Sequence, residues 1–152
     1  MKKQVFFSIL ILYCMLSPVF AENPETIIEK YMNMECVDTD IIEKSMMEAG
    51  KPLAAFQDFA DGKIDSIRFV NISNCDLETK KQFSADFSAF TESDHYIISK
   101  TIQQDDGAAR IIIWKKDGII YKVFVFMNDN LVSVGAVVLF GEMKNYSPYL
   151  LN

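Results

Sequence analysis

The spacing of apolar residues changes along this chain, from a mostly helical period in the first half to a strand period in the second. Between residues 24 and 90, several stretches place apolar side chains three and four positions apart, which is typical of helices with one buried face. From Tyr96 onward, apolar and polar residues alternate, which is typical of strands. Helices early and consecutive strands late predict an α+β fold.

Two helices have clear starting signals. Asn23-Pro24-Glu25 predicts a helix start, because Asn is a favoured cap and Pro is favoured at the first helical position. A second helix is predicted over Asp76–Phe90. Each helix has an apolar stripe, formed by Ile27, Ile28, Tyr31 and Met32 in the first and by Leu77, Phe83, Phe87 and Phe90 in the second.

The region between these helices is less regular. The stretch CVDTDIIEKSMMEAG favours an edge strand from about Val37 to Glu43 and then a helical turn over 45–49, although the capping-box spacing of Asp40 and Glu43 leaves a helix open. A further helix is predicted from Pro52, carrying Leu53, Phe56 and Phe59 and ending at Gly62. A strand is expected over Ile64–Ile72, which is rich in Ile, Phe and Val.

Four strand patterns fill the rest of the chain. They are Tyr96–Gln103, Arg110–Lys115, Ile119–Met127 and Leu131–Phe140, separated by Asp105-Asp106-Gly107, Lys116-Asp117-Gly118 and Asn128-Asp129-Asn130. These short polar segments supply the residues with positive φ that tight hairpins need. We therefore expect a four-strand meander within an antiparallel sheet of about six strands, packed against two to three helices.

The segment Val123–Phe140 is almost long and apolar enough to cross a bilayer. A spanning helix would bury Asn128-Asp129-Asn130 near its middle, which is costly for the charged Asp. The same three residues are well suited to a turn, so the segment is predicted to be a β-hairpin. Because its strands are apolar on both faces, we expect them to run through the centre of the sheet, with helices covering one side.

The first 21 residues predict an export signal. Lys2 and Lys3 precede an apolar run, and Val19-Phe20-Ala21 offers small residues for cleavage after Ala21. Cys14 follows Tyr13 rather than a small residue, so a lipoprotein is not expected. Cleavage would remove 21 of the 152 residues and leave one α+β domain of 131 residues, 22–152, with a tail from about residue 144 and a place in the periplasm or outside the cell.

The net charge of the chain makes some classes of binding partner unfavourable. The formal net charge of the chain is −6, and loss of Lys2 and Lys3 makes it more negative. Such a chain is a poor partner for nucleic acid or for anionic lipid.

Cys36 and Cys75 remain after cleavage, and in an exported protein they form either a disulfide or two buried thiols.

Catalytic chemistry finds little support in the sequence. His95 is the single histidine, which excludes a multi-histidine metal site, and it is expected at a strand start without a nucleophile motif nearby. The best carboxylate group is Asp38, Asp40 and Glu43, which either binds a cation such as Ca²⁺ or forms the solvated face of an edge strand. No catalytic or cofactor-binding residue, and no cofactor, is predicted.

The chain resembles the DUF4252 family, small exported proteins common in Bacteroidetes. The resemblance covers most of the predicted domain and rests on "IIEKYMNMECVDTDIIEKSMMEAG", "IDSIRFVNIS" and the hairpin ending "LFGEM". It implies one α+β domain outside the cytoplasm, without an established activity or functional residues. In such an organism Asp65-Ser66-Ile67 also resembles an envelope O-glycosylation acceptor, or Ser66 simply faces solvent.

These observations favour a non-enzymatic exported domain that binds an envelope protein or a small ligand, through a sheet face or an edge strand. Candidate contact residues are Met46 and Met47, with Met34 and Met143, which otherwise fill the core. The tail residues Tyr149, Leu150 and Leu151 either dock on the domain or offer a peptide to a partner. The alternatives are a hydrolase-like enzyme, whose site would form from scattered carboxylates, and a structural subunit that associates with itself.

Overall fold

The described strands between Asp38 and Tyr146 all belong to one sheet. The computed structural model describes residues 23–49, 60–105 and 107–146. The elements in chain order are α2 (Pro24–Met32), β1 (Asp38–Glu43), α3 (Lys44–Ala49), β2 (Ala60–Asn71), α5 (Leu77–Ala89), β3 (Tyr96–Gln104), β4 (Gly107–Lys116), β5 (Ile119–Asp129) and β6 (Ser133–Tyr146). The six strands are antiparallel and lie in the order β1-β2-β6-β5-β4-β3. The predicted α+β fold with its C-terminal meander is confirmed.

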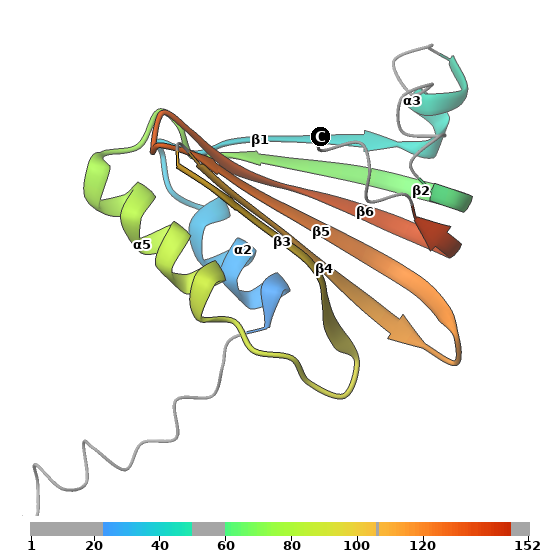
Figure 1. Cartoon of the computed structure of the whole chain (residues 1–152). Coiled ribbons are helices and arrows are strands. Elements are labelled where there is room, and N and C mark those ends of the chain that lie inside the picture. Colours follow the sequence, from blue (N-terminus) through green and yellow to red (C-terminus); the bar gives the residue numbers. More distant parts are fainter. Residues whose placement is uncertain (1–22, 50–59, 106, 147–152) are drawn as a thin grey trace, which may run out of the picture.

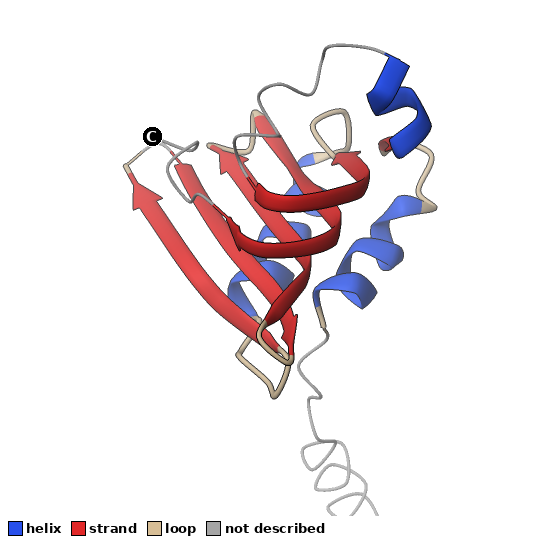
Figure 2. Ribbon diagram, turned by 90° about the vertical axis from the view of Figure 1, so that its right-hand side faces the viewer, coloured by secondary structure: helices blue, strands red, loops and turns tan. Residues whose placement is uncertain are grey.

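The two longer helices begin where their capping residues predict. The Asn23 side chain accepts a hydrogen bond from the Thr26 amide at 2.9 Å, ahead of Pro24 at the start of α2. The Asp76 side chain accepts one from the Thr79 amide at 2.7 Å at the start of α5. Both helices lie side by side against one face of the sheet, whereas α3 lies apart beside the end of β1 (Figures 1 and 2).

The central hairpin is held by a turn that requires left-handed backbone. Asn130 and Leu131 have φ values of 45° and 60°, and the Asn128 side chain accepts the Leu131 amide at 2.9 Å. Leu131 was expected to start a strand but lies in this turn, and β6 begins at Ser133. Val123–Phe140 therefore lies within the β5–β6 pair, as predicted. No helix among the described residues is long and apolar enough to span a membrane.

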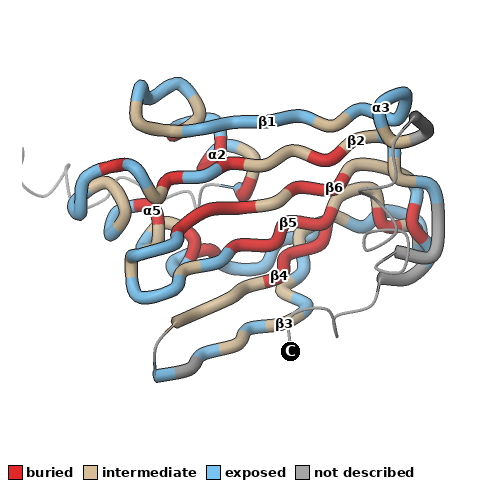
Figure 3. The backbone as a smooth tube through the Cα atoms, turned by 90° about the horizontal axis from the view of Figure 1, so that it is seen from above, coloured by how far each residue is buried: buried red, intermediate tan, exposed pale blue. Residues whose placement is uncertain are grey.

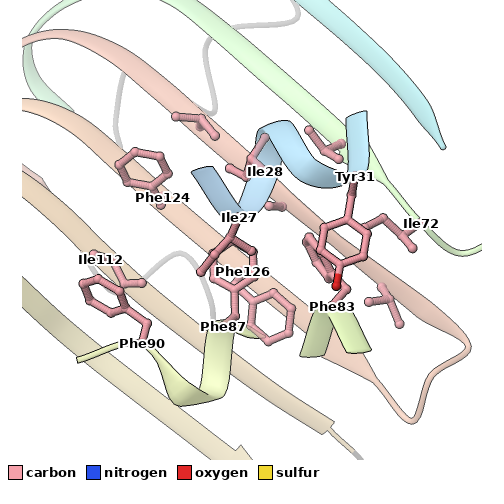
Figure 4. Packing of buried hydrophobic residues seen from close by; sticks show 14 of the residues in the cluster. Ile27, Ile28, Tyr31, Ile72, Phe83, Phe87, Phe90, Ile112, Phe124 and Phe126 are labelled. Carbon is pink, nitrogen blue, oxygen red and sulfur yellow. The ribbon is translucent and has the colours of Figure 1, made fainter. Parts of the chain in front are cut away.

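Both faces of the central strands are buried, which explains why this hairpin is so apolar. On the helix side the core contains Ile27, Ile28, Tyr31, Val70, Ile72, Cys75, Phe83, Phe87, Phe90, Ile112, Phe124, Phe126, Val134, Ala136 and Val138 (Figure 4). The other cluster contains Ile111, Ile113, Ile120, Val123, Val125, Leu139 and Met143. Burial is concentrated in β4, β5 and β6, while the edge strand β1 is largely exposed and β3 alternates between half-buried and exposed residues (Figure 3).

Three local predictions are wrong or incomplete. Leu77 was placed on the buried stripe of its helix but is 53% exposed, because it is the first residue of α5 and lies next to the cap. Gly62 does not end a helix, since it lies inside β2 and pairs with Met143. The predicted helical residues 52–59 lie outside the described residues.

A disulfide fixes the helix layer at one end. Cys36 and Cys75 are bonded at an S–S distance of 2.06 Å, across a sequence separation of 39 residues. Cys36 follows α2 and Cys75 precedes α5, so the bond joins the chain around the two helices. Of the two possibilities that the sequence left open, the structure contains the disulfide.

Candidate functional site

One row of side chains crosses the whole sheet on its helix side. The strand register places Glu43, Ser66, Phe140, Lys122, Trp114 and Tyr96 beside one another on β1, β2, β6, β5, β4 and β3, and we call these six residues the cross-sheet row. All of them except the exposed Glu43 are half-buried. Helices α2 and α5 lie under the half of the sheet that ends in the β5–β6 turn, and the strands extend beyond them (Figure 1). The row therefore lies at the N-terminal end of α2, where the helix layer stops.

Glu25 in the first turn of α2 connects the helix to the row. Its Oε1 accepts a hydrogen bond from Lys122 Nζ at 2.5 Å, and its Oε2 accepts one from the Tyr96 hydroxyl at 2.8 Å. Burial alone would raise the pKa of Glu25, but these two hydrogen bonds and the charges of Lys122 and Arg68 outweigh it and lower the pKa. Glu25 is therefore an ionised acceptor that fixes one cation and one phenol.

Burial also affects the phenol itself. It raises the pKa of the Tyr96 hydroxyl above its ordinary value, and the hydrogen bond to Glu25 raises it further. Tyr96 is consequently a hydrogen-bond donor and not a base at neutral pH. This part of the row is suited to holding a geometry and not to moving protons.

Trp114 is the centre of an aromatic group at the β4 end of the row. Its ring lies 5.3 Å from the Tyr121 ring and 5.9 Å from the His95 ring, and Lys122 Nζ lies 5.5 Å from its centroid. It is the only tryptophan in the chain. Half-exposed aromatic rings next to a cation provide a large contact area at low entropic cost, so this group is suited to recognition by stacking.

Arg68 lies on the same face of β2, two residues from Ser66. Its guanidinium lies over the Phe140 ring, with Cζ 5.4 Å from the ring centroid, and its NH1 lies 3.8 Å from the Met32 sulfur. Its Nε is buried without a hydrogen-bond partner. Two cations, Lys122 and Arg68, thus lie in the row and its flank, together with the carboxylates of Glu43 in the row and Glu25 on α2.

The three candidate carboxylates of β1 do not all lie on one face: Asp38 and Asp40 share a face, as expected, but Glu43 does not join them. Asp38 and Asp40 lie on the face of β1 opposite the helices, opposite Asn71 and Phe69 in the register, whereas Glu43 lies on the helix side. His95 precedes β3 at the other edge of the sheet, and its carbonyl accepts the Lys115 amide at 2.9 Å. Across residues 23–49, 60–105 and 107–146, no three His, Cys, Asp or Glu side chains are placed to hold a metal ion.

The predicted contact residues are separated as well. Met46 on α3 is 58% exposed and Met34 is 37% exposed, whereas Met143 is fully buried in the core and is not available to a partner. Met47 is half-buried. Ser66 belongs to the cross-sheet row. Tyr149, Leu150 and Leu151 lie outside the described residues.

Glu25, Arg68, Trp114 and Lys122 are not among the site residues predicted from the sequence. A signal was present, since Arg68 and Lys122 are isolated charges inside the otherwise apolar stretches IDSIRFVNI and IIYKVFVF. Burying a charged side chain in a central strand is costly unless the charge is paired or reaches solvent. What the sequence did not provide was the strand order, which brings β2, β6, β5 and β4 together.

Comparisons with protein-family models, with curated proteins and with solved structures found no match for this chain. The resemblance to the DUF4252 family therefore stays a prediction. Function is therefore inferred from the site geometry.

Proposed function

We propose that this protein is an exported, non-enzymatic binding domain that holds its ligand or partner protein on the cross-sheet row. The observation that carries the proposal is the half-exposed Tyr96, Trp114, Lys122 and Phe140 on four adjacent strands, beyond the end of the helix layer. Aromatic side chains and Arg are enriched where proteins bind partners, and the rigid aromatic rings bury much area for little lost freedom.

The electrostatics of the row support binding more than catalysis. Glu25 is already engaged by Lys122 and Tyr96, which fixes three side chains before any ligand arrives. Such preorganisation improves affinity because little side-chain freedom is lost on binding. Of the four residues that an acid–base enzyme could have used, Asp38 and Asp40 share one face of β1, Glu43 lies on the other face, and His95 lies at the opposite edge of the sheet.

Export is part of the proposal. The Lys2-Lys3 start, the apolar run and the small residues before position 22 support a cleaved signal, and the Cys36–Cys75 disulfide fits an oxidising compartment. The intact mass of the protein recovered from its native host tests this point. We expect a chain that begins at Glu22 and carries one disulfide, whereas a full-length chain with free thiols would contradict export.

Site-specific photo-crosslinking in the native host tests the binding face. A photoreactive p-benzoylphenylalanine in place of Trp114 should give a discrete adduct. The same group in place of Met127, which is 38% exposed on the opposite face of β5, is the matched control and should not. Equal adducts at both positions, or none at position 114, would contradict the proposed face. An adduct between two copies of this chain would favour a self-associating subunit instead.

A further inference from the structure

The chain contains only two arginines, and they lie in nearly equivalent places with different partners. Arg68 on β2 and Arg110 on β4 both lie on the helix side of the sheet. Each guanidinium lies over a phenylalanine ring, Phe140 for Arg68 and Phe90 for Arg110, and each Nε is buried without a hydrogen-bond partner. The two arginines differ in whether an oxygen atom accepts hydrogen bonds from the guanidinium group.

Arg110 has oxygen acceptors from a helix end. Its NH1 donates to the Phe87 and Ser88 carbonyl oxygens at 2.5 and 2.9 Å, so it caps the C-terminal end of α5, where the helix dipole favours a cation. Arg68 has no such acceptor among the described residues. Its NH1 contacts only the Met32 thioether sulfur at 3.8 Å, and sulfur is a weak acceptor.

The neighbours of Arg68 are mostly apolar, and one of them is partly exposed to solvent. Met32 of α2 and the Phe140 ring lie against the guanidinium. Directly opposite in the register is Ile41 of the edge strand β1, which is 42% exposed. Arg68 itself is half-buried. A ligand that approached between α2 and β1 would meet a cation with apolar walls.

Within residues 23–49, 60–105 and 107–146, no carboxylate neutralises this cation by direct contact. Glu25 is close enough for its charge to interact with Arg68, but its two oxygens accept from Lys122 and Tyr96. Glu43 lies on the same face of β1, and within the described residues Arg68 forms no ion pair with it or with any other carboxylate. A partly desolvated cation without an oxygen acceptor is unfavourable, so an incoming anion gains a charge-assisted hydrogen bond there.

We propose that Arg68 binds the carboxylate of a ligand whose apolar body packs against Phe140, Met32 and Ile41. This inference rests on the proposed binding function and names the chemistry of its ligand. The guanidinium fork matches the paired oxygens of a carboxylate or of a phosphate, and we choose the carboxylate because it carries the smaller negative charge. A dianion would also be repelled by Glu25 and Glu43. The carboxylate could belong to a free organic acid or to the C-terminus of a peptide.

Nuclear magnetic resonance of the full mature protein tests the proposal directly. With ¹⁵N-labelled arginine there are two Nε–H signals, and that of Arg110 is the internal control. The probes are hexanoate and phenylacetate with their amides, inorganic phosphate, and acetyl-Gly-Phe as acid and as amide. We expect the acids to shift the Arg68 signal saturably, while the amides, phosphate and the Arg110 signal do not respond. A stronger response to hexanoate and phenylacetate than to acetyl-Gly-Phe assigns a free acid, and the reverse assigns a peptide C-terminus.

A variant measures the contribution of the cation. Arg68→Met keeps the length and apolar character of the stem. It should raise the dissociation constant for the best acid by about tenfold to a hundredfold, because the charge-assisted hydrogen bond is lost. Unchanged affinity in Arg68→Met, acids and amides acting alike, no acid shifting the Arg68 signal, or equal shifts of both arginine signals would each overturn the proposal. Failure here, together with a Trp114 adduct in the native host, would remove the carboxylate inference and leave the binding face intact. Absence of that adduct would instead count against the binding face.

Discussion

Two carboxylates in this protein have the same kinds of partner but lie at different ends of the helix layer. Asp86 of α5 accepts hydrogen bonds from Lys30 Nζ at 2.8 Å and from the Tyr31 hydroxyl at 2.6 Å, both on α2. Glu25 of α2 accepts from Lys122 and Tyr96 of the sheet. The Asp86 side chain is 15% exposed and the Glu25 side chain is 35% exposed.

The difference between them separates what holds the fold from what is available for binding. At the Asp86 end, which we call the closed end, Tyr31 is buried in the core cluster that also contains Phe83, Phe87 and the Cys36–Cys75 disulfide. At the Glu25 end, which we call the open end, the cross-sheet row is half-exposed and Arg68 lacks an oxygen acceptor. A carboxylate that accepts from a lysine and a tyrosine thus joins α2 to α5 at the closed end. At the open end the same arrangement positions half-exposed side chains beside solvent.

The largest expected contrast is in core packing. Phe126 is 3% exposed and stacks on Phe87 with ring centroids 4.9 Å apart, so Phe126→Ala should lower the free energy of unfolding by about 4 kcal/mol. Trp114→Ala at the open end should cost about half as much, since that ring is only half-buried. Urea unfolding followed by circular dichroism measures both. Equal losses would contradict the distinction between the two ends.

The disulfide should be the next largest contribution to the closed end. Replacing both Cys36 and Cys75 with Ala should lower the free energy of unfolding by about 3 kcal/mol, because the bond closes a long loop in the unfolded chain. Urea unfolding of the oxidised protein and of the double variant gives the value, and the reduced wild-type protein is the control that should match the variant. A loss below about 1 kcal/mol would mean that this end is held without the bond.

The polar contact at the closed end is expected to contribute less. Asp86→Asn removes a charged acceptor from Lys30 and Tyr31 and should lower the free energy of unfolding by about 1.5 kcal/mol. A double-mutant cycle with Tyr31→Phe measures the coupling. If the tyrosine substitution costs as much in the Asp86→Asn background as in the wild type, the two side chains do not stabilise each other.

Features of the two ends that depend on residues close together in the sequence can be predicted, whereas features that depend on distant residues cannot. The α+β class, the caps at Asn23 and Asp76 and the turn at Asn128-Asp129-Asn130 follow from local chemistry, and the sequence predicts them. The aromatic stripe of Phe83, Phe87 and Phe90 also follows from spacing alone. Leu77 has the same spacing and is exposed, because burial at a helix end depends on what the first turn faces.

The open end could not be predicted in the same way. Lys122 and Phe140 become neighbours through the β5–β6 register, but Ser66 joins them only because β2 inserts between β1 and β6. That strand order is a long-range property that alternation along the chain does not determine. Asp38, Asp40 and Glu43 attracted attention because they are close in sequence, yet Glu43 lies on the opposite face from the other two.

The smallest predicted effect is the dependence of stability on pH at the open end. The folded-state pKa of Glu25 lies below its usual value of 4.5, because the hydrogen bonds from Lys122 and Tyr96 outweigh the effect of burial. The stabilisation from Glu25 is therefore fully present above the unfolded pKa and is lost as the pH falls through the lower folded pKa. Since more than a third of the side chain is exposed, solvent screening limits this contribution to less than about 1 kcal/mol.

Glu25→Gln should be less stable than the wild type at pH 7, and the difference should disappear in acid. Urea midpoints of both proteins between pH 7 and pH 3 test this, and Asp86 titrates in both and cancels from the difference. A difference that stayed constant with pH would mean that shape, and not charge, fixes Glu25 to the row.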